Sequence, residues 1–164
     1  CGHLASFISN LAQVIRIPEP TFSLISLNEQ ARSVYSLTSI ECRQRNIDLS
    51  LSLTDNDQYI HVDGIQFEQV LVNIIKNAYE AIGENGRIKI STHHSPLSII
   101  IEDNGPGISE EAKQKLFTPF FTTKSSGQGI GLMFVREVLT NHRCRFSLST
   151  EEGYTRFKIF FEVI

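Results

Sequence analysis

Ile99-Ile-Ile-Glu-Asp103-Asn-Gly105-Pro-Gly107-Ile108 is the most informative stretch of the chain for its architecture, because an apolar run leads directly into Asp-x-Gly-x-Gly. The isoleucines are typical of a strand that faces a core. A carboxylate at the end of such a strand can accept a hydrogen bond from an exocyclic amine, and the glycines let a flat base approach the backbone. Asp-Asn-Gly is also typical of an ordinary turn, and both interpretations stand for this stretch alone.

Alternating patterns on both sides of this stretch predict further strands. Apolar and polar residues alternate from Ile47 to Leu53, which predicts a half-buried strand. Strand character is also present in residues 59–62, 87–93 and 97–102, and in a hairpin of residues 143–150 and 154–163. These segments predict one mostly antiparallel sheet, because several of them are joined by short turns.

Helical spacing marks three other segments and the amino terminus. The clearest helix runs from Gly64 to Ile82 and ends at Gly83-Glu-Asn-Gly86. Ser26-Leu-Asn-Glu29 is a capping box that predicts a helix continuing toward Arg45. A third helix is expected over residues 130–141, and an amphipathic helix over residues 2–17. The expected core faces are Ala31, Val34, Tyr35, Leu37, Thr38 and Ile40 on one long helix, and Val70, Leu71, Ile74, Ile75, Ala78 and Ala81 on the other, with Gln66, Gln69, Asn73, Asn77 and Glu80 opposite.

The order of these elements predicts an α+β fold, a two-layer α/β sandwich whose mostly antiparallel sheet is covered by about three helices on one face. Residues 21–164 form one domain in this prediction, and residues 1–20 form an appended helix and linker. Residues 104–128 are expected to be a long loop with a short helical piece. A loop of that length in a compact domain is more often functional than idle.

Composition and charge exclude several function classes. The chain has 164 residues, of which 41% are hydrophobic, so it can bury a real core. Its formal net charge of −3 carries no basic run, which argues against nucleic acid or a polybasic membrane contact. Its three cysteines have no metal-binding spacing, which favours a reducing, cytoplasmic compartment. Because the chain begins with Cys1, we expect a fragment of a longer protein.

Asn73 and Asn77 lie one turn apart on one face of the predicted 64–82 helix. The plain explanation is a solvated helix face. Asparagine is a poor former of helix interiors, however, so two of them in a well-patterned helix call for a local reason. Coordination of a hard cation through the amide oxygen is such a reason.

Gly127-Gln-Gly129-Ile-Gly131-Leu132 stands at the start of the predicted third helix, where backbone N–H groups and the helix dipole can receive phosphate. It matches neither the dinucleotide fingerprint nor the Walker A pattern, and glycine patterns alone are weak evidence. The preceding Leu116-Phe-Thr-Pro-Phe-Phe-Thr-Thr-Lys124 places a lysine where it could reach a terminal phosphate. Its aromatic pair is otherwise an ordinary packing anchor.

Taken together and in this order, the four segments resemble the N, G1, F and G2 boxes of the ATPase superfamily shared by DNA gyrase, heat-shock protein 90, histidine kinases and the mismatch-repair protein MutL. The resemblance covers roughly residues 63–163 and implies a Bergerat-type ATP-binding fold. It further implies that Asn77 holds Mg²⁺, that Asp103 binds the adenine amino group, and that Gly105 and Gly107 shape the adenine pocket. It implies an ATP lid over about residues 104–128, with a phosphate cradle and contacts made by Lys124, Gly127, Gly129, Gly131 and Leu132.

Asn73 points to one branch of this superfamily. Gyrase-like and chaperone-like members have a glutamate at this position that activates water. Asn73 and the sequence from Leu116 to Lys124 instead resemble those of histidine kinases. The resemblance therefore implies a phosphotransferase, with Asn73, Asn77 and Lys124 as catalytic residues. Phosphoryl transfer is catalysed mainly by positioning and charge neutralisation, so the acceptor can belong to another element.

No histidine of this chain has the sequence context of a phosphoacceptor. The segment 2–17 with Arg16-Ile-Pro-Glu-Pro20 resembles the end of the dimerisation hairpin of kinases related to the nitrogen-regulation family. The resemblance thus implies an acceptor histidine before Cys1, a homodimer formed through that hairpin, and a response regulator as partner. It implies a cytoplasmic domain, compatible with a membrane-bound sensor.

Two other functions remain open at this point. One is a stand-alone serine kinase of the anti-sigma-factor type, against which the linker-like segment 2–20 argues. The other is a nucleotide-gated binding module without catalysis, against which the intact Asn77, Asp103 and glycines argue.

Overall fold

The structure is a computed structural model that describes residues 17–107 and 129–163. The predicted helix over residues 2–17 lies outside the described residues except for Ile17, and so do Lys124 and Gly127 of the predicted lid. The described elements are β1 (Ser23–Ser26), α2 (Leu27–Gln44), β2 (Ile47–Ser52), β3 (Tyr59–Val62), α3 (Gly64–Ile82), β4 (Gly86–His94), β5 (Leu97–Asp103), α5 (Gly129–Asn141), β6 (Arg145–Glu151) and β7 (Tyr154–Phe160).

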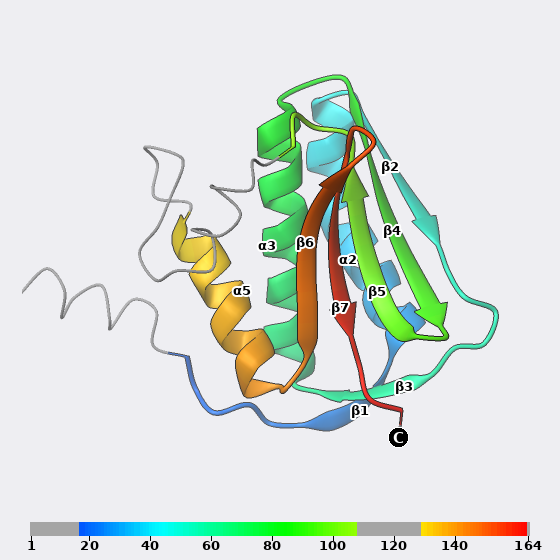
Figure 1. The fold of residues 1–164 in the computed structure, drawn as a ribbon, viewed down its shortest axis with the longest axis vertical. Coiled ribbons are helices and arrows are strands. Elements are labelled where there is room, and N and C mark those ends of the chain that lie inside the picture. Colours follow the sequence, from blue (N-terminus) through cyan, green and yellow to red (C-terminus); the bar gives the residue numbers. More distant parts are fainter. Residues whose placement is uncertain (1–16, 108–128, 164) are drawn as a thin grey trace, which may run out of the picture.

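Two layers make up the molecule (Figure 1). One is a five-stranded sheet with the order β2-β4-β5-β7-β6, in which β2 and β4 are parallel and the other neighbours antiparallel. The helices α2, α3 and α5 cover one face of it, and the short antiparallel pair β1–β3 closes one end. The predicted two-layer fold class is confirmed. No helix among the described residues is both long and apolar enough to cross a membrane.

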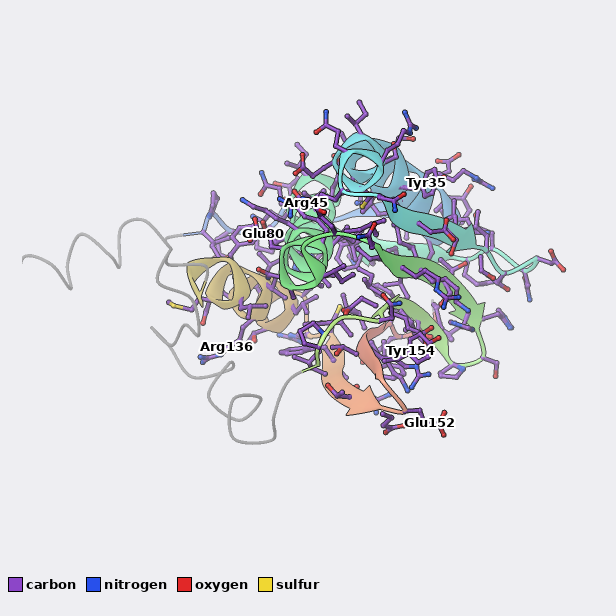
Figure 2. The ribbon with its side chains drawn as sticks, turned by 90° about the horizontal axis from the view of Figure 1, so that it is seen from above. Tyr35, Arg45, Glu80, Arg136, Glu152 and Tyr154 are labelled. Atoms are coloured by element: carbon purple, nitrogen blue, oxygen red, sulfur yellow. The ribbon has the colours of Figure 1, made fainter. Side chains whose placement is uncertain are left out.

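The core lies between the helices and the covered face of the sheet. Its largest fully buried side chains include Phe67, Leu71 and Ile75 of α3, which pack toward strand residues such as Ile90 and Ile99. Burial of each such side chain stabilises the fold by roughly 1.5–3 kcal/mol relative to exposure. The opposite face of the sheet carries Arg156 and Lys158 together with aromatic residues of β7, among them Tyr154 at the start of that strand (Figure 2).

The predicted helix boundaries are confirmed for α2 and α3. Ser26 caps α2, since the backbone N–H of Glu29 donates to its hydroxyl oxygen at 3.1 Å. Asp63 caps α3, where its Oδ1 accepts the backbone N–H groups of Ile65 and Gln66 at 3.1 Å each. Gly83 ends α3 in the left-handed region, with φ of 79°.

Four expectations about individual residues are wrong: Leu37, Ile40 and Ala81 were expected in the core but are exposed, and Gln66 was expected on the solvent face but is buried. Leu37 and Ile40 of α2 are 57% and 63% exposed, because the helix buries a narrower stripe through Val34, Thr38 and Cys42. Gln66, expected on the solvent face of α3, is buried, and its side-chain amide donates to the carbonyl of Pro18 at 2.9 Å. Strand β1 was not expected from the sequence; it forms by antiparallel pairing with β3.

Candidate functional site

A cavity of about 80 Å³ lies between α3 and the sheet, near the end of β5. It brings together four of the predicted site residues, namely Asn77, Asp103, Gly107 and Leu132. The other lining residues are mainly apolar: Ile74, Ala78, Ala81, Ile101, Leu148, Thr155 and Phe157. An apolar wall with a few polar groups at its edge is the usual character of a small-molecule site.

Asp103 is the charged group of this cavity. It is the last residue of β5 and only 9% exposed. Its Oδ1 accepts the backbone N–H of Gly105 at 2.9 Å. Burial raises the pKa of the Asp103 carboxyl above its ordinary value, and the Gly105 hydrogen bond offsets only part of that rise. The carboxylate is therefore held in one orientation in a poorly solvated place, where a bound donor would stabilise its charge.

Gly105 and Gly107 shape this corner because neither position has room for a side chain. A Cβ at Gly105 would stand 2.9 Å from Oδ1 of Asp103 and 3.2 Å from Cγ1 of Ile82. Gly107 has φ of 81°, and a Cβ there would stand 2.7 Å from Cγ2 of Thr150. Both glycines let the backbone after β5 pass close to α3 and β6 while the cavity stays open.

Asn77 and Asn73 do not face one cavity. Asn77 lines the Asp103 cavity, and its buried Nδ2 has no hydrogen-bond partner among the residues that the structure describes. Asn73 lines a separate shallow groove of about 300 Å³ with Glu68 and Phe134. The two asparagines are one helical turn apart in α3, as predicted, but Asn77 shares its cavity with Leu132 of α5 and Asn73 shares its groove with Phe134 of α5.

The start of α5 stands beside the cavity. This helix begins at Gly129, runs past Gly131, and contributes Leu132 to the cavity wall. The amino end of a helix carries a partial positive charge and unpaired N–H groups, and no acidic residue occupies the first turn of α5. An anionic group attached to a molecule in the cavity would meet this end.

The described residues offer little for a tightly held metal ion. No group of three His, Cys, Asp or Glu side chains in residues 17–107 and 129–163 could hold one. A hard cation near Asn77 would need further oxygen ligands from a bound molecule and water, which is how Mg²⁺ is commonly held.

Several lining residues were missed from the sequence. Ile101, Leu148, Thr155 and Phe157 belong to the core-facing positions of β5, β6 and β7, and the strand pattern predicts only that they face inward. Thr155 had a local signal, because a hydroxyl interrupts the inward apolar series that continues with Phe157 and Ile159. Its hydroxyl lies 3.3 Å from that of Thr150.

A larger concavity of about 780 Å³ lies elsewhere, beside β1 and the carboxyl end of α5. Phe22, Leu24, His142 and Phe161 line it, and none of the predicted site residues does. Volume alone therefore does not identify the site that the sequence pattern predicts.

Residues 62–163 match the protein family described as Histidine kinase-, DNA gyrase B-, and HSP90-like ATPase. This chain belongs to that family. As a member of the histidine kinase-like ATPases, it is 35% identical to the catalytic domain of histidine kinase ThkA in a nucleotide-free form, with a TM-score of 0.78 over 86% of this chain and 95% of that one. The match covers nearly all of the ThkA domain.

Two other matches are to chains that are longer than this one. Sensor histidine kinase ZraS of Escherichia coli (strain K12) is 30% identical over 148 residues, which is 89% of this chain and 32% of ZraS. The chain thus spans about a third of the length of this relative. ThkA in complex with the response regulator protein TrrA is 29% identical, with a TM-score of 0.78 over 98% of this chain and 47% of that chain.

Proposed function

We propose that this chain is the catalytic domain of a two-component sensor histidine kinase, which binds Mg·ATP and transfers its γ-phosphate to a histidine outside the chain. The observation that carries the proposal is Asp103, a buried carboxylate fixed by Gly105 at the edge of an apolar cavity. In the proposed complex the cavity takes the adenine ring, and Asp103 accepts a hydrogen bond from its amino group. Gly105 and Gly107 give the ring access to the backbone.

Asn77 suits a magnesium site of the kind that depends on the nucleotide. Its side chain reaches the cavity, and its buried Nδ2 lacks a partner among the described residues, so the amide is not committed elsewhere. We propose that its Oδ1 holds Mg²⁺, which would neutralise phosphate charge. Asn73, in place of a water-activating glutamate, favours transfer to a protein over hydrolysis.

The phosphates are proposed to lie at the amino end of α5. Gly129 and Gly131 belong to its first turn, where N–H groups are unpaired and the dipole is positive. Leu132 contributes to the adenine wall. Gly127 and Lys124 complete the proposed phosphate contacts from the lid of residues 104–128, most of which lies outside the described residues.

The rest of the proposal concerns the longer protein. Residues 1–20 would be the end of a dimerisation hairpin of the nitrogen-regulation type, with the acceptor histidine before Cys1 and a homodimer formed there. The response regulator that accompanies ThkA in its complex supports a response regulator as partner of this chain as well. A cytoplasmic location follows from this assignment, and no nucleic acid partner is proposed.

A transfer experiment tests the activity. The chain is mixed with γ-labelled ATP, Mg²⁺ and the hairpin fragment encoded upstream in the same gene. We expect label on the hairpin that is labile in acid and stable in base, as phosphohistidine is. Acid-stable label on a partner protein would instead indicate a serine kinase. Nucleotide binding without any transfer would indicate a binding module.

The Asn77→Ala variant tests the magnesium assignment separately. Wild-type affinity for ATP, measured by calorimetry, is expected to rise when Mg²⁺ replaces EDTA, and the variant should lose most of that gain while its affinity in EDTA stays unchanged. Gln69→Ala, on an exposed position of the same helix, is the matched control. An undiminished response to Mg²⁺ in the Asn77 variant contradicts the assignment.

A further inference from the structure

The carboxyl end of α3 lacks a cation of its own. This end carries a partial negative charge and carbonyl groups without intrahelical partners, yet α3 has no basic residue in its last turn. The last two turns of α3 carry Ala78 and Ala81, which line the Asp103 cavity. Whatever fixes this end of α3 therefore also fixes one wall of the cavity.

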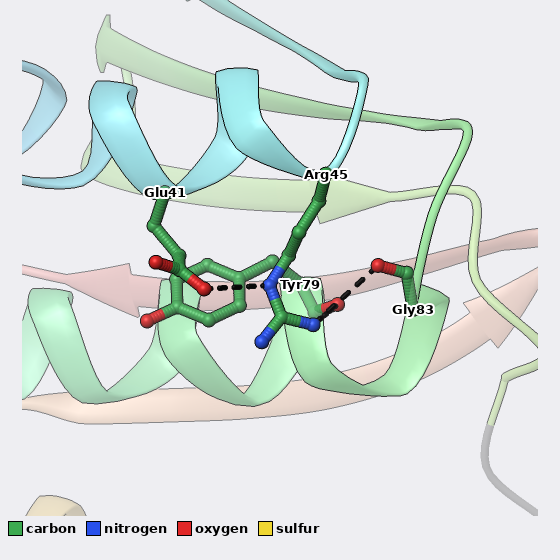
Figure 3. A network of polar contacts seen from close by, with 4 residues as sticks. All are labelled: Glu41, Arg45, Tyr79 and Gly83. Carbon is green, nitrogen blue, oxygen red and sulfur yellow. Dashed lines mark hydrogen bonds and ion pairs between the residues drawn. The ribbon is translucent and has the colours of Figure 1, made fainter.

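Arg45 supplies the missing cation from another element. It stands at the carboxyl end of α2, and its guanidinium lies over the ring of Tyr79, 4.7 Å from the ring centroid. Nη1 donates to the carbonyls of Tyr79 and Gly83 at 3.5 and 3.4 Å, and Nε donates to Glu41 at 2.8 Å (Figure 3). The two carbonyl contacts are long, but they place the positively charged guanidinium beside the negative end of the helix dipole.

The backbone of Arg45 makes a second attachment. Its carbonyl accepts the N–H of Asn85 at 3.0 Å, and the side chains of Asn46 and Asn85 are joined at 2.6 Å. Both asparagines have positive φ, 54° and 60°, so each chain turns sharply at this point. These two hydrogen bonds join the turn between α2 and β2 to the turn between α3 and β4. Arg45 and Glu80 of α3 lie close to these turns (Figure 2).

The side-chain contacts of Arg45 and the contacts of its backbone both lie next to residues that adjoin Asp103. Ile82, in the last turn of α3, stands so close to Gly105 that a Cβ there would be 3.2 Å from its side chain. At the start of β4, after the turn that contains Asn85, the backbone N–H of Arg87 donates to Oδ1 of Asn104 at 2.7 Å. Gly105 and Asn104 directly follow Asp103, and the Gly105 N–H holds its carboxylate.

We propose that Arg45 is a positioning residue for the nucleotide site. It holds the carboxyl end of α3, and the residues Asn104 and Gly105 that follow β5, in the geometry that orients Asp103. Arg45 does not line the cavity itself. The inference rests on the proposed function, since it assumes that the cavity takes adenine.

Arg45→Met keeps the length of the aliphatic chain but removes the charge and the donors. We expect its dissociation constant for Mg·ATP, measured by calorimetry below the unfolding range of both proteins, to rise about 3- to 30-fold. The ratio of ATP to GTP affinity should fall as well, because a displaced Asp103 selects less well for an amino group. Arg43→Met, an exposed arginine of the same helix turn, is the control and should match wild type.

Arg45→Lys separates positioning from plain stabilisation. Lysine keeps the charge but not the planar stacking, so we expect partial recovery of both the affinity and the base preference. This variant also decides the matter if Arg45→Met does not fold. Unchanged affinity and unchanged base preference in a folded Arg45 variant, with only a lower melting temperature, would overturn the inference. Failure of the wild-type chain to bind any nucleotide would overturn the proposed function itself.

Discussion

The carboxylates beside the two ends of α3 are held in opposite ways. At the amino end, Asp63 accepts three backbone N–H groups, from Thr21 at 2.8 Å and from Ile65 and Gln66 at 3.1 Å. Burial would raise the pKa of Asp63, but these hydrogen bonds outweigh it and the pKa is lowered. At the carboxyl end, Asp103 has one such bond, and its pKa is raised.

The neighbouring groups repeat this contrast. His142, beside Asp63, is satisfied on both ring nitrogens: Nε2 accepts the Asp63 N–H at 3.0 Å, and Nδ1 donates to the carbonyl of Val138 at 2.7 Å. Asn77, beside Asp103, keeps a buried Nδ2 without a partner among the described residues. Asp63 and His142 are thus hydrogen-bonded within the fold, whereas Asp103 and Asn77 keep polar atoms that a ligand could meet, as functional sites commonly do. Oε1 of Gln66, in the first turn of α3, is the exception at the amino end, because it is buried without a partner among the described residues.

The largest expected effect comes from Asp103→Asn. Loss of a hydrogen bond to a charged acceptor should weaken ATP binding about 10- to 100-fold. Stability of the ligand-free chain should not fall, because a carboxyl whose pKa is raised on folding weakens the folded state while it is ionised. Calorimetry and urea unfolding at neutral pH measure the two quantities. Asp48→Asn, on an exposed position of β2, is the control. A marked loss of stability in the Asp103 variant alone would show that Asp103 stabilises the fold, as Asp63 does.

Asp63→Ala should produce the opposite pair of results. Removal of a helix cap costs about 1–2 kcal/mol in the free energy of unfolding, and here the contact with Thr21 is lost as well. ATP affinity should stay within about twofold, because Asp63 stands at the far end of α3 from the cavity. Asp63→Asn keeps an acceptor oxygen and should lose less stability. If ATP affinity falls along with stability, the two ends are not independent.

The smallest expected effect concerns pH. Burial lowers the pKa of His142 below its ordinary value of 6.5, despite the hydrogen bond to Val138 and the charge of Asp63. The unfolded chain therefore takes up a proton first, and stability should decline as pH falls below about 6.5, by at most about 1 kcal/mol over one pH unit.

Urea unfolding of wild type and His142→Gln, between about pH 7.5 and 5.5, measures this difference. The variant should lack that part of the decline, and His61→Gln, an exposed histidine of β3, should keep it. Equal pH profiles for wild type and His142→Gln would show that His142 does not titrate differently on folding.

Much of this architecture could be predicted from local patterns. The alternating segments, the Ser26 cap and the glycine stop after Ile82 each depend on neighbours in the sequence, and the structure has them where they were expected. Asp103 was singled out because its position depends only on where an apolar strand ends.

The rest depends on contacts between distant segments. Strand β1 exists because Ser23–Ser26 pairs with β3, and the side-chain amide of Gln66 donates to the carbonyl of Pro18, far away in the sequence. Asn77 lines the cavity with Leu132 and Asn73 lines a groove with Phe134, an arrangement that helical spacing alone cannot supply. Arg45 belongs to no motif, and its contacts with Tyr79 and Gly83 join residues more than thirty positions apart.

Helix α5 has one more consequence. Its 13 residues make a rod about 20 Å long. Leu132 near one end forms part of the cavity wall, and His142 just past the other end is bonded to Asp63, which in turn holds Thr21 of the incoming chain. One helix thus spans the distance between the wall of the ligand cavity and the place where the chain from Thr21 meets the domain.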